Sequence, residues 1–227
     1  MSRLRSFQVA FAAAMALACS PAMADLVSSR ASLGATDHID WDQIPLDASF
    51  PTAAVVTALG EAASVSSGNS ANLWRLDQGG PPNGYWQANF TPGEALVLSF
   101  SGVISLSFTD AVAGAGTQFA NGARYGAFDA TLTAFDASGN LLETHTVAGS
   151  TGPGFDGSAV FVGLARAQAD ISRLEFRVSS PAGSEYPVIN RVDILQAAVV
   201  PEPGAGLLAL LGLPVIAWAR SRQRKSW

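Results

Sequence analysis

The sequence predicts an all-β protein, a single antiparallel β-sandwich of jelly-roll type. Three observations predict this fold. Apolar and polar residues alternate with a period of two through much of 95–180, turns with glycine and proline recur between the alternating runs, and no convincing helical period occurs from 92 to 198. Short strands at such spacing are typical of two-sheet sandwiches. The 227 residues are enough for one core of useful size.

The clearest strands are those with a strictly alternating sequence. In 104–109 apolar side chains alternate with hydroxyls, and in 173–178 they alternate with charges. Each run would place one apolar face against a core. The runs 128–135 and 141–147 flank the polar, glycine-containing segment 136–140, so they predict a hairpin.

Weaker signals complete the expected architecture. Further strands are expected at 157–164 and 188–195, separated by glycine, proline and aspartate. The segment 52–63 is expected to form one short helix or a loop. The sandwich would then occupy 25–199, between a signal peptide and one C-terminal transmembrane helix.

The charge of the predicted sandwich limits its partners. Between Asp25 and Val200 there are seven arginines, no lysine and 17 acidic residues, which gives a net charge of about −10. Nucleic acid and anionic membrane surfaces are therefore poor partners. The single cysteine, Cys19, lies in the predicted signal, so the sandwich has no disulfide. Two histidines are too few for a histidine-rich zinc site.

The segment 1–24 has the three parts of a secretion signal. A start with two arginines precedes an apolar stretch at 7–18 and an Ala-Met-Ala ending that contains Ala22 and Ala24. This order predicts export by the Sec machinery and cleavage by signal peptidase after Ala24. Acylation of Cys19 as a lipoprotein is the alternative.

The segment 200–227 combines a motif, an apolar stretch and a basic cluster. The sixteen apolar residues at 204–219 would reach about 24 Å as a helix, slightly short of a ~30 Å hydrocarbon core. Long basic side chains can bridge that difference. The basic cluster should stay in the cytoplasm, which places the sandwich outside. The motif is Pro201, Glu202 and Pro203, and the basic residues are Arg220, Arg222, Arg224 and Lys225.

This order of elements resembles the PEP-CTERM sorting signal of Gram-negative bacteria. The resemblance implies that an exosortase-type membrane protease recognises and processes the tail. The protein would then sit transiently in the inner membrane, reach the cell surface or extracellular matrix, and associate with exopolysaccharide and biofilm. Gly204 stands where many members carry serine or threonine, and Pro214 interrupts the helix. An anchor that is never cut is the alternative.

Part of the sandwich is also similar to the ectodomains that often accompany PEP-CTERM tails. The similar segments are 122–125, 132–142, 156–163 and 189–193. This resemblance implies a fold and no particular reaction.

Catalytic motifs are not apparent. A nucleophilic triad needs a histidine beside a serine and a carboxylate. His145 lies in a predicted strand between two threonines, where an edge or surface histidine is expected, and no G-x-S-x-G elbow occurs. The sequence therefore favours a protein that is not an enzyme, and no catalytic residue is assigned.

An acidic segment is a candidate calcium site. Asp37, Asp40 and Asp42 fall within six residues of a loop-like stretch, and calcium prefers oxygen ligands in irregular geometry. Asp25 or Asp193 would complete the site if the ends of the domain meet. The spacing differs from that of an EF-hand, and a solvated acidic loop is the alternative.

Three aromatic residues are candidates for glycan binding. Trp74, Tyr85 and Trp86 flank a segment rich in glycine and proline. Rings on a loop can stack on the apolar faces of sugars, although large rings also cap the ends of cores.

These patterns favour a non-enzymatic surface or matrix protein that binds polysaccharide. The main competitor is a secreted, carboxylate-dependent glycoside hydrolase, which needs two acids at a defined separation. A pair of facing acids with displaced pKa values would favour the hydrolase. An exposed aromatic platform would favour binding.

Overall fold

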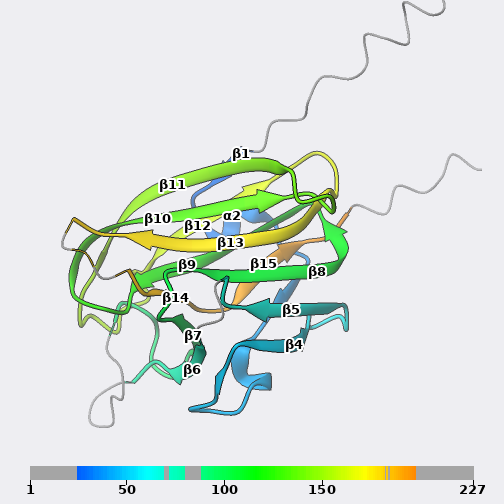
Figure 1. Ribbon diagram of the computed structural model, residues 1–227. Coiled ribbons are helices and arrows are strands. Elements are labelled where there is room, and N and C mark those ends of the chain that lie inside the picture. Colours follow the sequence, from blue (N-terminus) through cyan, green and yellow to red (C-terminus); the bar gives the residue numbers. More distant parts are fainter. Residues whose placement is uncertain (1–24, 69–71, 80–87, 182, 184, 198–227) are drawn as a thin grey trace, which may run out of the picture. The chain divides into compact units, whose positions relative to one another are not determined.

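The computed structural model describes residues 25–68, 72–79, 88–181, 183 and 185–197 (Figure 1). The predicted signal at 1–24 and the predicted sorting segment at 200–227 lie outside these residues. In the part of the chain that is described, no helix has the length and apolar character needed to cross a membrane.

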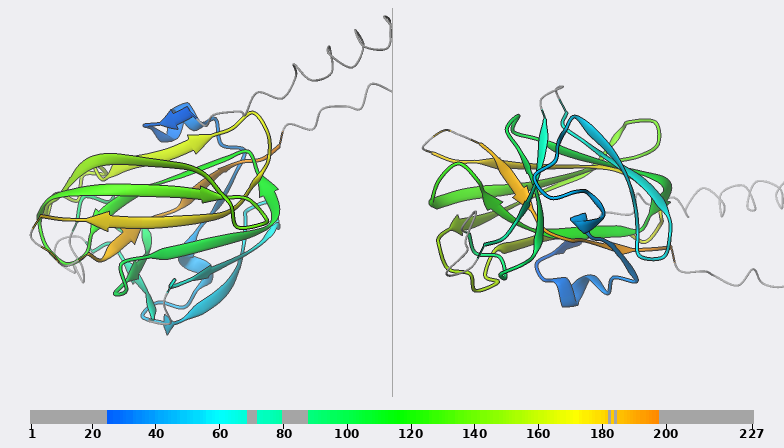
Figure 2. Two further views of the ribbon diagram at one scale, coloured as in Figure 1. Left: turned by 45° about the horizontal axis from the view of Figure 1, so that its top comes forward. Right: turned by 90° about the horizontal axis from the view of Figure 1, so that it is seen from below.

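The described chain forms two antiparallel sheets, so the predicted sandwich of antiparallel strands is confirmed (Figures 1 and 2). The nine-stranded sheet is here called sheet A and the six-stranded sheet is called sheet B. Sheet A contains β1 (Asp25–Val27), β2 (Asp37–Ile39), β3 (Ser49–Phe50), β6 (Leu73–Asp77), β7 (Ala95–Ser99), β9 (Gly114–Asn121), β12 (Val160–Ala165), β14 (Pro187–Ile189) and β15 (Val192–Leu195). Sheet B contains β4 (Thr52–Val56), β5 (Ala62–Ser66), β8 (Ile104–Val112), β10 (Gly126–Phe135), β11 (Leu141–Thr151) and β13 (Ile171–Ser179).

Successive strands cross between the sheets in an interleaved order. The neighbours in sheet A run β1-β12-β9-β14-β7-β6-β3, and β15 joins β9 to β2. The neighbours in sheet B run β11-β10-β13-β8-β5-β4. From β7 onward, the orders β7-β14-β9-β12 and β8-β13-β10-β11 are those of an eight-stranded jelly roll.

The main core lies between the two sheets. Phe119 of sheet A and Phe176 of sheet B are fully buried, and their ring centroids lie 5.8 Å apart. Trp41 is also fully buried, in the 3₁₀ helix η1 (Trp41–Gln43). Its indole Nε1 donates a hydrogen bond to the backbone oxygen of Asn190 at 2.8 Å. The core therefore ties the N-terminal segment to the last strands.

The strands predicted from strict alternation are present in sheet B. The run 104–109 lies in β8 and the run 173–178 lies in β13. The predicted hairpin is formed by β10 and β11. Its turn is closed by the Asp136 carboxylate, which accepts hydrogen bonds from the amides of Ser138 and Asn140, each at 2.8 Å.

The expectation of a short helix or a loop at 52–63 is wrong. The segment instead forms β4 and the start of β5, joined by a turn in which Gly60 has a φ of 93°. Pairing holds these strands in place, because β5 pairs with both β4 and β8 and so adds both strands to sheet B. The expected strand at 157–164 corresponds to β12, and the one at 188–195 is divided into β14 and β15.

The two outer faces of the sandwich differ in character. The outer face of sheet A carries two further apolar clusters. One joins Leu33 of the short helix α2 (Arg30–Leu33) to Phe161 of β12. The other joins Leu96 and Leu98 of β7 to Phe90. The outer face of sheet B instead carries hydroxyl pairs such as Thr131 with Thr146 and the charged residues Arg173, Glu175 and Arg177.

Candidate binding surfaces on the outer face of sheet A

Three aromatic residues form a row across adjacent strands of sheet A, here called the aromatic row. Trp74 belongs to β6, Phe100 follows β7, and Tyr186 precedes β14. The ring centroids of Trp74 and Phe100 lie 5.9 Å apart, and those of Phe100 and Tyr186 lie 5.2 Å apart in an edge-to-face arrangement. Because β14, β7 and β6 are neighbours, these three residues meet although they are distant in sequence.

Strand alternation turns the aromatic row away from the main core. Leu98 and Val188 are paired, and both belong to the outer apolar cluster. Phe100 lies two residues after Leu98 and Tyr186 two residues before Val188, so both share that outer face. Phe100 remains 48% exposed. The row therefore rests on an apolar base and presents an aromatic ring to solvent.

The predicted glycan-binding residues have different outcomes. Trp74 lies in the aromatic row, and its indole Nε1 is buried with no hydrogen-bond partner among the described residues. Tyr85 and Trp86 lie outside the described residues. Phe100 and Tyr186 were not predicted from the sequence. The available signal was Leu96-Leu98-Phe100, an alternation that continues beyond its strand onto an exposed ring.

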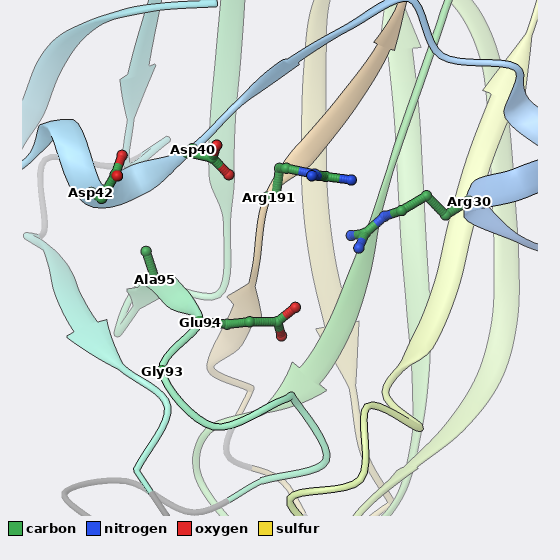
Figure 3. A pocket seen from close by; sticks show the side chains of 7 residues that line it. All are labelled: Arg30, Asp40, Asp42, Gly93, Glu94, Ala95 and Arg191. Atoms are coloured by element: carbon green, nitrogen blue, oxygen red, sulfur yellow. The ribbon is translucent and has the colours of Figure 1, made fainter. Parts of the chain in front are cut away.

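A pocket of about 290 Å³ also opens on the outer side of sheet A (Figure 3). In Figure 3, Arg30 and Arg191 extend toward the same space, and Glu94 points toward it from the other side. The pocket thus brings two guanidinium groups near three carboxylates. The pocket is here called the charged pocket, and its lining residues are Arg30, Asp40, Asp42, Gly93, Glu94, Ala95 and Arg191.

Two buried polar residues hold the walls of this pocket. Asp193 is 2% exposed and forms ion pairs with Arg30 and, at 3.0 Å, with Arg191. Asn190 is fully buried. Its Oδ1 accepts a hydrogen bond from Arg30 at 3.3 Å, and its Nδ2 donates one to Glu94 at 3.2 Å. Side chains fixed in this way are preorganised for binding.

The predicted calcium ligands are placed in three different settings. Asp37 lies in β2 rather than in a loop, and its carboxylate accepts hydrogen bonds from the amides of His38 and Leu59 at 2.8 and 3.1 Å. Burial raises the pKa of Asp37, but hydrogen bonds from Thr57 and these amides outweigh it and hold the pKa below its ordinary value.

Asp40 and Asp42 face different partners from Asp37. Asp40 lies 3.0 Å from the Nε2 of His38, and both Asp40 and Asp42 line the charged pocket. Asp193, a possible further ligand, is held by arginines. Over the described ranges, no three histidine, cysteine or acidic side chains are grouped to hold a metal. Calcium binding stays a prediction.

The charged pocket offers both donors and acceptors of hydrogen bonds. Guanidinium groups donate in a fixed planar fork, and carboxylates accept. Each hydroxyl of a sugar both donates and accepts, so a polyhydroxylated ligand suits such walls.

His145 lies on the edge strand β11, and its Nε2 is buried without a partner in the described part of the chain.

Comparisons with known proteins give no family. No family model matches this chain, and no curated protein matches it.

Several solved structures are similar in part. A DUF4465 family protein from Bacteroides caccae shares 12% identity over 76% of this chain and 99% of its own, with a TM-score of 0.35. The K2 cleaved adhesin domain of Lys-gingipain shares 12% identity over 71% of this chain and 100% of its own, with a TM-score of 0.37. TmCBM61, solved in complex with β-1,4-galactotriose, shares 16% identity over 59% of this chain and 88% of its own, with a TM-score of 0.32. Similarities of this size do not identify a ligand for this chain.

Proposed function

We propose that this chain is an exported, non-enzymatic protein of the cell surface or extracellular matrix, and that it binds polysaccharide through the aromatic row. The observation that carries the proposal is the exposed ring of Phe100 between Trp74 and Tyr186. An aromatic platform is the feature expected of binding rather than of hydrolysis.

The spacing of the aromatic row suits an extended ligand. Neighbouring strands lie about 4.8 Å apart, and one ring lies on or directly beside each of β6, β7 and β14. A sugar chain that runs across the strands would stack on the exposed ring of Phe100 and contact the tilted rings on either side of it. Each stacking contact is weak, so affinity would come from the row as a whole.

Affinity electrophoresis in gels that contain the exopolysaccharide of the native host tests this proposal. Phe100→Ala should weaken binding roughly three- to tenfold, because one stacked ring is worth about 1 kcal/mol. Leu141→Ala is the matched control. Leu141 is 62% exposed and lies beside the β10–β11 turn of sheet B, whereas the aromatic row lies on sheet A. Equal retardation of the two variants would contradict the proposal.

Delivery by the predicted sorting tail is a separate part of the proposal. The Pro201-Glu202-Pro203 motif, the apolar stretch and the basic cluster support processing by an exosortase-type protease. Intact-mass analysis of surface and medium fractions, with and without a functional exosortase, tests it. Loss of the tail only when exosortase is present is expected. A mature form that retains 207–227 in both strains would indicate a permanent anchor.

The charged pocket supports the second candidate function, a carboxylate-dependent glycoside hydrolase. Asp40, Asp42 and Glu94 line one pocket, and such hydrolases need two carboxyl groups. The binding proposal expects no release of reducing ends from the exopolysaccharide. Release that is abolished by Glu94→Gln would favour the hydrolase.

A further inference from the structure

The strands at the ends of the two sheets differ greatly in length. An edge strand leaves one row of backbone amide and carbonyl groups without a partner strand, and proteins usually shorten or block such edges. Sheet A ends in β1 with three residues and β3 with two, and its side strand β2 has three. Sheet B ends in β4, which has five residues and follows Pro51, and in β11, which has eleven. Within the described residues, β11 is therefore the long edge.

The sequence of β11 lacks the usual protection of an edge. It contains no proline, lysine or arginine, and Glu143 is its one acidic residue. Its register with β10 is continuous from Glu143 to Thr151, so no bulge turns this stretch away. Figure 1 shows β11 at the border of the sheet, with β10 beside it.

The side chains of β11 suit antiparallel pairing with themselves. If Thr146 faces Thr146 of a second copy, Thr144 faces Ala148 and Glu143 faces Gly149. Like charges directly opposite each other destabilise strand pairs, and this register places none opposite each other. Apart from Leu141 at the start of the strand, the exposed residues of β11 are small or hydroxylated, so the outer face of sheet B can continue across the junction.

Within one copy, Thr146 already belongs to a line of polar side chains that runs across neighbouring strands of sheet B. Its Oγ1 lies 3.0 Å from the Oγ1 of Thr131 on β10, and Thr131 faces Arg177 on β13. Pairing centred on Thr146 would continue this line of polar side chains into the second copy without a break.

From these features we infer that two copies of this chain pair edge to edge through β11, antiparallel and centred on Thr146, so that their six-stranded sheets form one continuous sheet. This inference does not depend on polysaccharide binding.

Sedimentation velocity of the exported protein, produced from the full chain in a Gram-negative host, tests the inference. The wild type should show a dimer that dissociates on dilution. Thr146→Lys should weaken dimerisation roughly tenfold or more, because it places like charges directly opposite. Thr52→Lys is the matched control, since Thr52 is an exposed threonine on β4, the opposite edge of sheet B. This variant should dimerise like the wild type.

A mixing experiment tests the register. An equimolar mixture of Thr146→Lys and Thr146→Glu should restore the dimer, because the two copies then place opposite charges at the centre. A monomeric wild type at all concentrations, equal effects of Thr146→Lys and Thr52→Lys, or no recovery in the mixture would each overturn the inference. The circular dichroism spectrum of every variant checks its folding separately from its dimerisation.

Discussion

The guanidinium of Arg30 donates a hydrogen bond to the carboxylate of Asp193, a residue 163 positions later in the chain. Asp193 is almost fully buried, whereas the side chain of Arg30 is one-third exposed. The pair joins α2 to β15 and positions the Arg30 side chain at the charged pocket. The first and last parts of the described sandwich are therefore coupled by an ion pair as well as by the core.

Arg30→Met should destabilise the protein by roughly 1–3 kcal/mol, because it removes one of two partners of a buried carboxylate. Arg191 remains to share the charge, which limits the loss. Arg177→Met is the control, since Arg177 is half exposed and its pair with Glu175 should contribute no more than about 1 kcal/mol. Urea unfolding measures both. Equal stability losses in the two variants would show that burial of Asp193 has no special weight.

Trp41→Phe should also destabilise the fold, by roughly 1–3 kcal/mol. The substitution leaves unfilled space in the main core and removes the donor to the Asn190 oxygen. Trp74→Phe serves as the comparison, because the Trp74 indole has no hydrogen-bond partner among the described residues and is partly exposed. Thermal unfolding should show a larger drop in melting temperature for Trp41→Phe than for Trp74→Phe. The reverse order would refute this assignment of the core.

Gly116→Ala tests the close approach of β9 to β12. A Cβ at Gly116 would lie 2.5 Å from the ring of Phe161 and 2.8 Å from the Cα of Gly163. The neighbouring backbone would have to move, so we expect a loss of roughly 1–3 kcal/mol. At Gly152 the nearest atom would be 3.8 Å away, and Gly152→Ala should change stability by less than about 0.5 kcal/mol. A tolerated Gly116→Ala would mean that these strands lie further apart.

The sequence predicted the strands of sheet B better than those of sheet A, and burial explains the difference. In β13 one face packs on the core and the other meets solvent, so apolar and charged residues alternate. In β9 both faces are covered, and almost every residue is buried whether it is apolar or polar. Its small residues Gly114, Ala115 and Gly116 carry no period of two. Coverage of the second face comes from distant segments, which a local pattern cannot reveal.

The candidate site was only partly predictable for a related reason. The prediction grouped Trp74 with aromatic residues close to it in sequence. The structure instead brings Phe100 and Tyr186 to it through strand pairing, because Trp74 faces Leu98 and Leu98 faces Val188. Which strands become neighbours in a jelly roll depends on the whole fold. The walls of the charged pocket likewise come from four separate segments of the chain.

The stability of the fold should fall in acid partly through Glu175. Burial raises the pKa of this carboxyl, but hydrogen bonds and charges from Arg177 and Arg173 outweigh it and hold the pKa below its ordinary value of 4.5. The unfolded chain then takes up the proton more readily than the folded chain. The contribution of Glu175 is therefore complete above about pH 4.5 and is lost as the pH falls through the lower pKa of the folded state.

Glu175→Gln should therefore lower stability at neutral pH by roughly 0.5–1 kcal/mol and flatten its decline in acid. Asp37 also has a lowered pKa, so the decline should become shallower and not disappear. Urea unfolding of both proteins from pH 7 to pH 3 measures the two slopes, and their stabilities should converge at the acid end. High salt should narrow the difference at neutral pH, because it screens the arginine charges. Parallel curves over the whole range would mean that Glu175 gains nothing from its two arginines in the folded state.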